Sequence, residues 1–557
     1  MASATPQAWP RAALWQRLAD TTSAGQAFDL AVIGGGATGL GVALDATVRG
    51  FKVLLADSHD FAEGTSSRAT KLAHGGVRYL AQGDIGLVRE ALHERGAMLA
   101  NAPHVAQRLG FVMPAYQWWE RGFYGLGLKA YDALSGSQGL GGTRWLSAQQ
   151  AQAQLPGLRR QGPQGVLQGG VMYWDGQFDD ARLALLLART ALARGALVLN
   201  HAPVTALLHE HGQVRGLVLR DGETGAEHRV AARCVVNATG VWVDGVRALD
   251  QPTEAGAAGA AGAAPQTPLV APSQGVHLVV DRAFLPGSQA LLVPKTADGR
   301  VLFAVPWYGK TVLGTTDTPR KDLAREPEPM AAEVDFILRE AGRYLARAPQ
   351  RADVRSVWVG LRPLVKPQVV AAAAATGAAA GASTQALSRE HTVLISASGL
   401  VTVTGGKWTT YRAMAEDVLQ QAMTRGLLPP RPGGATARLS LLGAAPGRPL
   451  AEPPGEHIYG SEAAALRALP GAERWLWRDA ESGRGGLSEA MVRFAARYEL
   501  ARTVGDVLAR RSRVLFLDAA AAAELAASVA DILTEELGRA VDTTAFTALA
   551  AKYRRLP

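Results

Sequence analysis

The chain has 557 residues, of which 48% are hydrophobic and 19% are charged, and this composition excludes a disordered or fibrous protein. A chain of this length is too long for one compact core, so we expect two or three domains. The formal net charge of +9 favours anionic partners, but no run of five or more Lys or Arg indicates a nucleic-acid-binding tail, so we expect no nucleic-acid partner.

The first predicted elements form a dinucleotide-binding unit. Residues 1–27 are an N-terminal extension without a continuous apolar segment, so we expect no secretory signal there. The apolar run FDLAVI at 28–33 predicts a buried strand, and GGGATG then leads into a small-residue helix that ends near Arg49. KVLLA at 52–56 predicts the next buried strand.

The loop after the first strand carries the G-x-G-x-x-G fingerprint of dinucleotide binding. Gly34 permits the tight turn, Gly36 lets the backbone approach a pyrophosphate, and Gly39 lets the helix pack closely on the strand. The pyrophosphate would lie at the helix N-terminus, where N–H groups and the helix dipole favour negative charge. Asp57 ends the second strand 18 residues after Gly39, where an acid binds the adenosine ribose.

The middle of the chain contains a second dinucleotide signature. Helical patterns at 86–101 and 179–194 precede a meander of strands between 196 and 240. The last of these strands contains the only cysteine, Cys234, which we expect to be a buried apolar side chain, and no multi-cysteine metal site is expected. This strand ends in Ala238, Thr239 and Gly240, which is typical of FAD-binding folds and brings the backbone close to the cofactor.

The last third of the chain predicts more strands and then helices. Strands are expected at 275–281, 300–317 and 391–406, followed by a helix from Lys407 to about residue 424. Two Ala/Gly-rich segments, 254–268 and 371–386, are interpreted as exposed loop expansions. Residues 428–487 are predicted as a Pro/Gly-rich linker region and residues 488–557 as a small helical domain. The sequence contains no strongly apolar stretch of 18 residues, so we expect any membrane contact to be peripheral.

One long motif makes the interpretation specific. Residues 64–80 read GTSSRATKLAHGGVRYL, which resembles the FAD-dependent, quinone-linked glycerol-3-phosphate dehydrogenases. YWDGQFDDARL, GVHLVVD, GTTDTP, GLRPL and GGKWTTYR agree with that family in order and spacing, and the resemblance covers roughly residues 28–545. It implies an α/β fold with an FAD-binding Rossmann-like domain, an interleaved antiparallel-sheet substrate domain within residues 28–427, and a small all-helical C-terminal domain.

The same resemblance implies roles for individual residues. Ser66, Ser67, Lys71 and His74 would lie along the flavin and its pyrophosphate, together with the backbone of Gly405 and Gly406. The residues implied at the substrate or at the edge of the flavin are Arg78, Tyr79, His277, Thr315, Arg362, Arg389 and Lys407. An Ala/Gly-rich expansion separates two of these arginines in the sequence and leaves their relative placement open.

The implied reaction is the oxidation of glycerol 3-phosphate to dihydroxyacetone phosphate, with hydride transfer to FAD. A phosphate dianion requires bidentate Arg donors and a Lys charge, which Arg78, Arg362, Arg389 and Lys407 would supply. His277 is the first candidate for the base and His74 is the alternative.

The resemblance also implies that quinone receives the electrons. The net charge of +9 favours peripheral binding to an anionic membrane surface, which we expect on the inner face of the cytoplasmic membrane, and a homodimer is compatible with the sequence. Three other activities stay open. They are a glycerol-3-phosphate oxidase that uses oxygen, another flavoenzyme of the amino-acid-oxidase type, and an RNA-binding flavoprotein.

Overall fold

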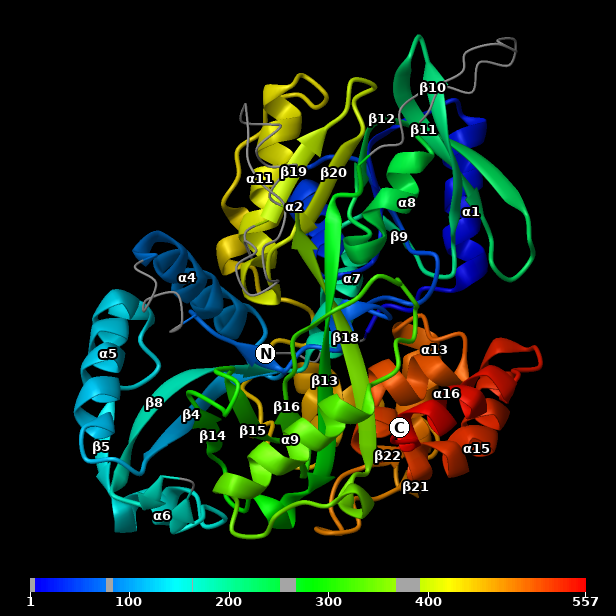
Figure 1. The fold of residues 1–557 in the computed structure, drawn as a ribbon. Helices are drawn as coiled ribbons and strands as arrows, with labels where there is room; N and C mark the ends of the chain where they lie inside the picture. Colours follow the sequence, from blue (N-terminus) through cyan, green and yellow to red (C-terminus); the bar gives the residue numbers. More distant parts are fainter. Residues whose placement is uncertain (1–5, 77–83, 163, 251–266, 367–390) are drawn as a thin grey trace.

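The computed structural model describes residues 6–76, 84–162, 164–250, 267–366 and 391–557 (Figure 1). Two sheets and a C-terminal group of helices form the fold, and the chain alternates between the sheets before it enters the helices. Among the described residues, no helix combines the length and apolar character needed to span a lipid bilayer. The expected fold class is confirmed.

The first sheet forms the dinucleotide-binding domain. β1 is parallel to β2 on one side and to β12 on the other, and β2 is followed by β9. β20 is parallel to β12, while β10, β11 and β19 are antiparallel to their neighbours. The strands are β1 (Phe28–Ile33), β2 (Val53–Ala56), β9 (Leu197–Leu199), β10 (Val204–Glu210), β11 (Gln213–Arg220), β12 (Glu227–Asn237), β19 (His391–Ile395) and β20 (Val401–Gly405).

Helices cover the parallel part of this sheet, which explains why β1 and β2 are nearly continuous apolar runs and not alternating ones. α2 contacts α7 and α11, and all three contribute buried side chains to the same core as β1. The helices are α2 (Ala37–Val48), α7 (Asp180–Ala193) and α11 (Tyr411–Thr424). α1 (Arg11–Ser23) was not predicted from the extension; it buries Leu14, Trp15 and Leu18 and contacts β9 and β12.

The second sheet forms the interleaved domain expected for the substrate, and it is mostly antiparallel. Its central path runs β17-β13-β16-β15-β14-β4-β8-β3, with β18 paired to β13 and β5 paired to β8. The strands are β3 (Leu72–Ala73), β4 (Ala106–Ala115), β5 (Arg144–Ser147), β8 (Gly169–Phe178), β13 (Val270–Asp281), β14 (Ala290–Val293), β15 (Leu302–Trp307), β16 (Lys310–Gly314), β17 (Thr318–Pro319) and β18 (Ser356–Val365). The helices beside the strands are α4 (Ile85–Asn101), α5 (Glu120–Ser135), α6 (Ala148–Gln154) and α9 (Ala331–Tyr344).

The C-terminal domain packs against β18 of the second sheet and against α7 of the dinucleotide-binding domain (orange to red in Figure 1). It consists of α13 (Glu489–Tyr498), a π-helix (Asp506–Arg511), α14 (Val514–Leu517), α15 (Ala519–Leu537) and α16 (Thr544–Arg554). The stretch 428–487 that precedes it contains α12 (Ala463–Arg467), and it buries leucines in the dinucleotide-binding core and, further along, in the core of the C-terminal domain. The Pro/Gly-rich composition therefore corresponds to an irregular but packed connection.

Candidate active site

A cleft with a volume of 380 Å³ lies at the carboxyl ends of β1, β2, β12 and β20. Parallel sheets bind their ligands at this edge because the strand ends and the helix N-termini meet there. Ten residues predicted to bind cofactor or substrate line the cleft. They are Gly34, Gly36, Asp57, Ser66, Ala238, Thr239, Gly240, Gly405, Gly406 and Lys407.

The glycine fingerprint leaves space for a cofactor in this cleft. Gly34 has φ +111°, and a Cβ atom there would lie 2.7 Å from the carbonyl oxygen of Ala238. A Cβ atom on Gly39 would clash with the carbonyl of Gly34, so this glycine lets α2 pack against the loop. The N-terminal end of α2 opens into the cleft at Gly36 and Ala37, where backbone N–H groups and the helix dipole favour a phosphate anion.

Asp57 lies at the end of β2 and faces the cleft. Its carboxylate accepts the backbone N–H of Gly35 at 2.5 Å and that of His59 at 2.8 Å. Burial raises the pKa of the Asp57 carboxyl to about 6, although the two N–H donors oppose this shift. An acid at this position suits the ribose hydroxyls of an adenine dinucleotide.

The opposite side of the cleft is formed after β20. Gly405 and Gly406 adopt φ values of +82° and +72°, which residues with a side chain rarely adopt. Lys407 follows them, and the indole N–H of Trp408 donates to the carbonyl of Ser66 at 2.8 Å. The glycine loop, the helix terminus, the acid and this second backbone turn together fit FAD.

Sequence reasoning missed several residues that line the cleft. They are Asp60, Glu63, Trp242, Arg325 and Trp408. Of these, Trp408 could have been predicted from the motif GGKWTTYR, because a side chain that directly follows the glycine turn and Lys407 must lie near the cleft.

Three residues expected along the flavin lie outside the lining of the cleft, namely Ser67, Lys71 and His74. The ammonium of Lys71 is fully buried, forms an ion pair with Asp180 at 2.8 Å and donates to the carbonyl of Ser67 at 2.7 Å. Burial and the charge of Arg513 lower the pKa of Lys71 to about 7, although Asp180 opposes this shift. His74 follows β3 and is half-buried. The placement of Lys71 differs from the expectation, because its side chain stabilises the protein interior.

The guanidinium of Arg362 is fixed at the edge of the second sheet. It donates to the carbonyls of Gln274 at 3.3 Å and Thr316 at 3.0 Å, and lies 3.3 Å from Oγ1 of Thr315 and 3.4 Å from Asp317. The next residue, Pro363, lines the cleft. The structure thus brings Arg362 and Thr315 together, next to a residue that lines the cleft.

Gly275 makes this arrangement sterically feasible, since a Cβ atom there would lie 2.5 Å from Nη2 of Arg362. Lys407 approaches from the side of β20 and lines the cleft itself. Arg78, Tyr79 and Arg389 lie outside the described residues.

His277 lies two residues further along β13, within the interior. Its ring stacks on Trp358 with centroids 5.3 Å apart, and its Nε2 atom lies 2.9 Å from Oγ1 of Thr70. Nδ1 is buried and has no hydrogen-bond partner among the described residues. Burial, together with the charges of Lys71 and Arg362, holds the pKa of His277 well below its usual range, so the imidazole is neutral at pH 7.

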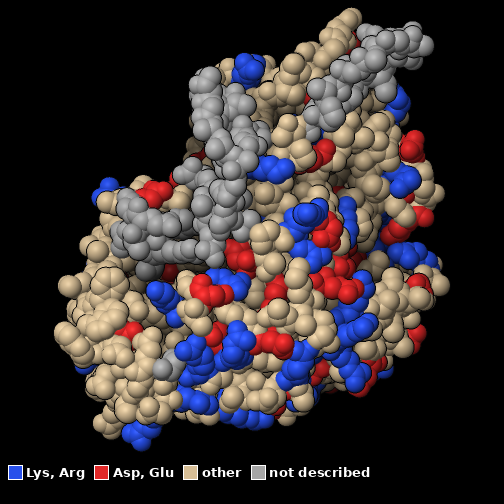
Figure 2. Space-filling view, viewed as in Figure 1, with Lys and Arg blue, Asp and Glu red and all other residues tan. Residues whose placement is uncertain are grey.

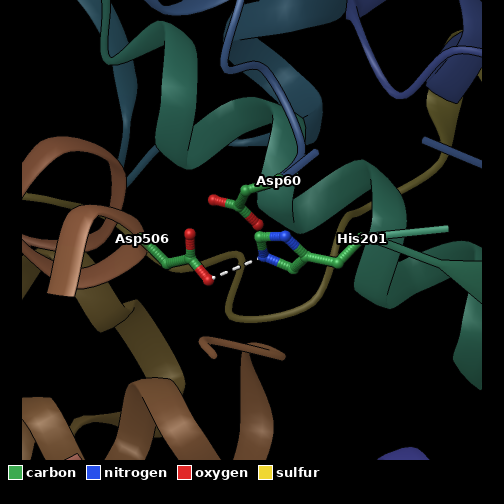
Figure 3. Close-up of side chains that lie close together, drawn as sticks. All are labelled: Asp60, His201 and Asp506. Carbon is green, nitrogen blue, oxygen red and sulfur yellow. Dashed lines mark hydrogen bonds and ion pairs between the residues drawn. The ribbon is translucent and has the colours of Figure 1, made fainter. Parts of the chain in front are cut away.

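A cluster of the buried Asp60 and Asp506 with the half-buried His201 connects the cleft with the C-terminal domain. Figure 3 shows the three side chains facing one another, with His201 bonded to Asp506 at 3.0 Å. Their ligand atoms lie within 4.8 Å of one another, as in a metal site. However, Asp60 already accepts hydrogen bonds from Arg510 and Arg511, so guanidinium groups supply the positive charge there.

Comparisons with known proteins agree with this geometry. Residues 29–412 match the FAD dependent oxidoreductase family, and residues 456–544 match the C-terminal domain of alpha-glycerophosphate oxidase. The mitochondrial glycerol-3-phosphate dehydrogenase of Arabidopsis thaliana is 39% identical over 552 residues, which cover 92% of this chain and 84% of the relative. The human mitochondrial glycerol-3-phosphate dehydrogenase is 39% identical over 542 residues, covering 92% of this chain and 70% of the relative.

A solved structure extends the similarity to the fold. The glycerol-3-phosphate dehydrogenase of Bacillus halodurans in complex with FAD superposes with a TM-score of 0.70 at 27% identity, covering 96% of this chain and 97% of that chain. These findings confirm the expected family and the FAD cofactor. The chain therefore belongs to the FAD-dependent oxidoreductases, in the group of the glycerol-3-phosphate dehydrogenases.

Proposed function

We propose that this chain oxidises glycerol 3-phosphate to dihydroxyacetone phosphate and passes the electrons to a quinone at a membrane surface. Bound FAD supplies the hydride acceptor for this oxidation. The observation that carries the proposal is the fixed guanidinium of Arg362 beside Thr315 at the edge of the cleft. A planar guanidinium matches the oxygens of a phosphate group. Lys407, which lines the cleft, adds a second positive charge.

Removal of the hydroxyl proton needs a base beside the reacting carbon. His277 is the first candidate because its imidazole is neutral and its Nδ1 atom has no described partner. Thr70 fixes the orientation of the ring through Nε2, which leaves Nδ1 as the atom that would accept the proton. His74 remains the alternative.

Reduction of a soluble redox dye tests this function. The purified protein should be yellow, release FAD on denaturation and reduce the dye with glycerol 3-phosphate far faster than with glycerol. Equal rates with the two substrates would contradict a phosphate-binding site.

Oxygen is the second candidate electron acceptor. The match of residues 456–544 to the C-terminal domain of alpha-glycerophosphate oxidase favours it. Rapid oxygen consumption and hydrogen peroxide formation without dye or quinone would identify the protein as an oxidase, whereas slow oxygen consumption supports the quinone-linked reaction.

The proposed membrane contact is supported by an exposed aromatic face around α5. Exposed fractions are 83% for Trp118, 68% for Phe123 and 70% for Leu126, and Trp119 and Trp145 are also exposed. The region over α5 at the lower left of Figure 2 carries mostly uncharged side chains. Phe123 and Leu126 lie on α5, and the exposed tryptophans lie just before it and on β5. Exposed Trp, Phe and Leu side chains on one surface are typical of proteins that lie in the interface of a bilayer.

Basic side chains beside this face fit an anionic leaflet. Arg121 and Lys129 lie on α5, and the Lys129 ammonium is 5.7 Å from the ring of Trp145. With the net charge of +9, these residues favour binding to acidic lipids on the inner face of the cytoplasmic membrane, where quinone is available.

Vesicle sedimentation tests the membrane proposal. The protein should bind anionic vesicles more than neutral ones, and salt should release part of it. Phe123→Ser with Leu126→Ser should weaken binding by more than about tenfold, because two apolar side chains no longer insert. Met330→Ser, at an exposed apolar side chain before α9, serves as the matched control. Equal binding to neutral and anionic vesicles, or no effect of the α5 changes, would contradict it.

A further inference from the structure

One wall of the cofactor cleft is a single segment, residues 60–67, between β2 and β3. The residues of this segment that line the cleft are Asp60, Ala62, Glu63, Gly64, Thr65 and Ser66. The Ser66 hydroxyl also accepts the N–H of Ala37 at 3.0 Å, at the start of α2. The position of this wall segment therefore sets the width of the cleft beside the expected pyrophosphate.

The first end of the wall segment is held by the C-terminal domain. The carboxylate of Asp60 is fully buried and accepts hydrogen bonds from Arg510 and Arg511, with Nη2 of Arg511 at 3.0 Å from Oδ1. The side-chain amide of Asn200 donates to the same carboxylate at 3.0 Å. Arg510 also lies 3.3 Å from the carboxylate of Glu63. Two guanidinium groups thus bind the point where the segment begins.

The second end is held by the same stretch of chain. Nη2 of Arg513 donates to the carbonyl of Ser67 at 2.8 Å and lies 3.2 Å from the carboxylate of Asp180. The Arg513 side chain is fully buried and its guanidinium stacks on Phe516 at 4.1 Å. Residues 510–513 therefore contact the wall segment at both Asp60 and Ser67.

We propose that residues 510–513 act as an arginine clamp that determines how tightly the chain retains FAD. The clamp arginines are not among the described residues that line the cleft, so their role is to position the wall segment. Buried arginine–carboxylate contacts resist opening, because breaking one leaves an uncompensated charge in the interior. When the clamp is weakened, the cleft is correctly shaped in a smaller fraction of molecules, and the apparent affinity for FAD falls by that fraction.

FAD release from the purified holoenzyme, followed by flavin fluorescence after dilution, tests the clamp. Arg511→Met should weaken FAD retention about tenfold, within the usual range of coupling between two parts of a protein. Turnover per bound flavin should stay at the wild-type value, because Arg362 and His277 are not altered.

Arg502→Met is the matched control. Arg502 also joins the C-terminal domain to the dinucleotide-binding domain, by an ion pair with Glu223 at 2.6 and 2.8 Å, but within the described part of the chain its side chain forms this ion pair outside the wall segment. This variant should retain FAD like the wild type even where its melting temperature falls.

The clamp is overturned if Arg511→Met retains FAD normally, or if Arg502→Met loses it equally. Arg511→Lys covers the case in which the methionine variant does not fold. It keeps the charge but loses the two-pronged contact, and should release FAD about threefold faster. Normal retention in the lysine variant would then assign a purely structural role to Arg511. The FAD-retention measurements need no glycerol 3-phosphate, so this test of the clamp is independent of the proposed substrate.

Discussion

Replacing Arg362 with alanine is the sharpest test of the phosphate site. The substitution removes a guanidinium that lies 3.0–3.4 Å from four neighbouring oxygen atoms, which restrict its orientation. Loss of one charge-assisted pair to phosphate should cost about 2–4 kcal/mol of transition-state binding, or roughly thirty- to a thousandfold in kcat/KM. Because the side chain is 23% exposed, solvent screening favours the lower end of this range.

The assay is steady-state dye reduction with glycerol 3-phosphate and, in parallel, with glycerol. Arg362→Ala should lower kcat/KM for glycerol 3-phosphate and leave the slow turnover of glycerol nearly unchanged, because glycerol has no phosphate. Arg362→Lys should recover only part of the activity, since an ammonium cannot form the two-pronged contact. Arg339→Ala, at a 63% exposed arginine on α9, should behave like the wild type.

The flavin content of the Arg362 variants decides how the result is interpreted. Both should contain FAD at the wild-type level, because the side chain does not line the cleft. An equal loss of activity with glycerol and glycerol 3-phosphate, or loss of the flavin, would refute the reasoning and make Arg362 a structural residue.

Three further predictions concern the cofactor cleft. Because the pKa of Asp57 is raised to about 6 and its charged form should bind ribose hydroxyls, FAD affinity should fall by up to about tenfold per pH unit below pH 6. Asp57→Asn should remove this slope in fluorescence titrations between about pH 5 and 8. In the FAD-free protein the folded chain keeps this proton between about pH 4 and 6 while the unfolded chain releases it, so stability should decline as the pH rises through that window. Gly34→Ala forces a side chain into φ +111° against Ala238, and thermal unfolding should show a loss of about 1–3 kcal/mol together with weaker FAD retention.

The dinucleotide-binding half of the site could be predicted because its signals are local. β1 and β2 are short apolar runs, and the glycines between them are required by one tight turn. The direction of the Lys71 side chain could not be predicted, because its backbone adopts φ +66° and departs from strand alternation. The contacts of the arginine clamp could not be predicted from the sequence either, because Arg511 and Asp60 are 451 residues apart and only the fold brings them together.

The interleaved path of the chain has a consequence for how the protein is made. The cleft is lined by residues at the ends of β1, β2 and β12 and by the turn at 405–408. These elements are far apart in the sequence, so the ribosome synthesises them at different times. Contacts between such distant segments form late, because closing a long loop costs conformational entropy before the contact stabilises it. We therefore expect FAD to bind late in maturation, once β12 and the turn after β20 have joined β1 and β2 in the first sheet.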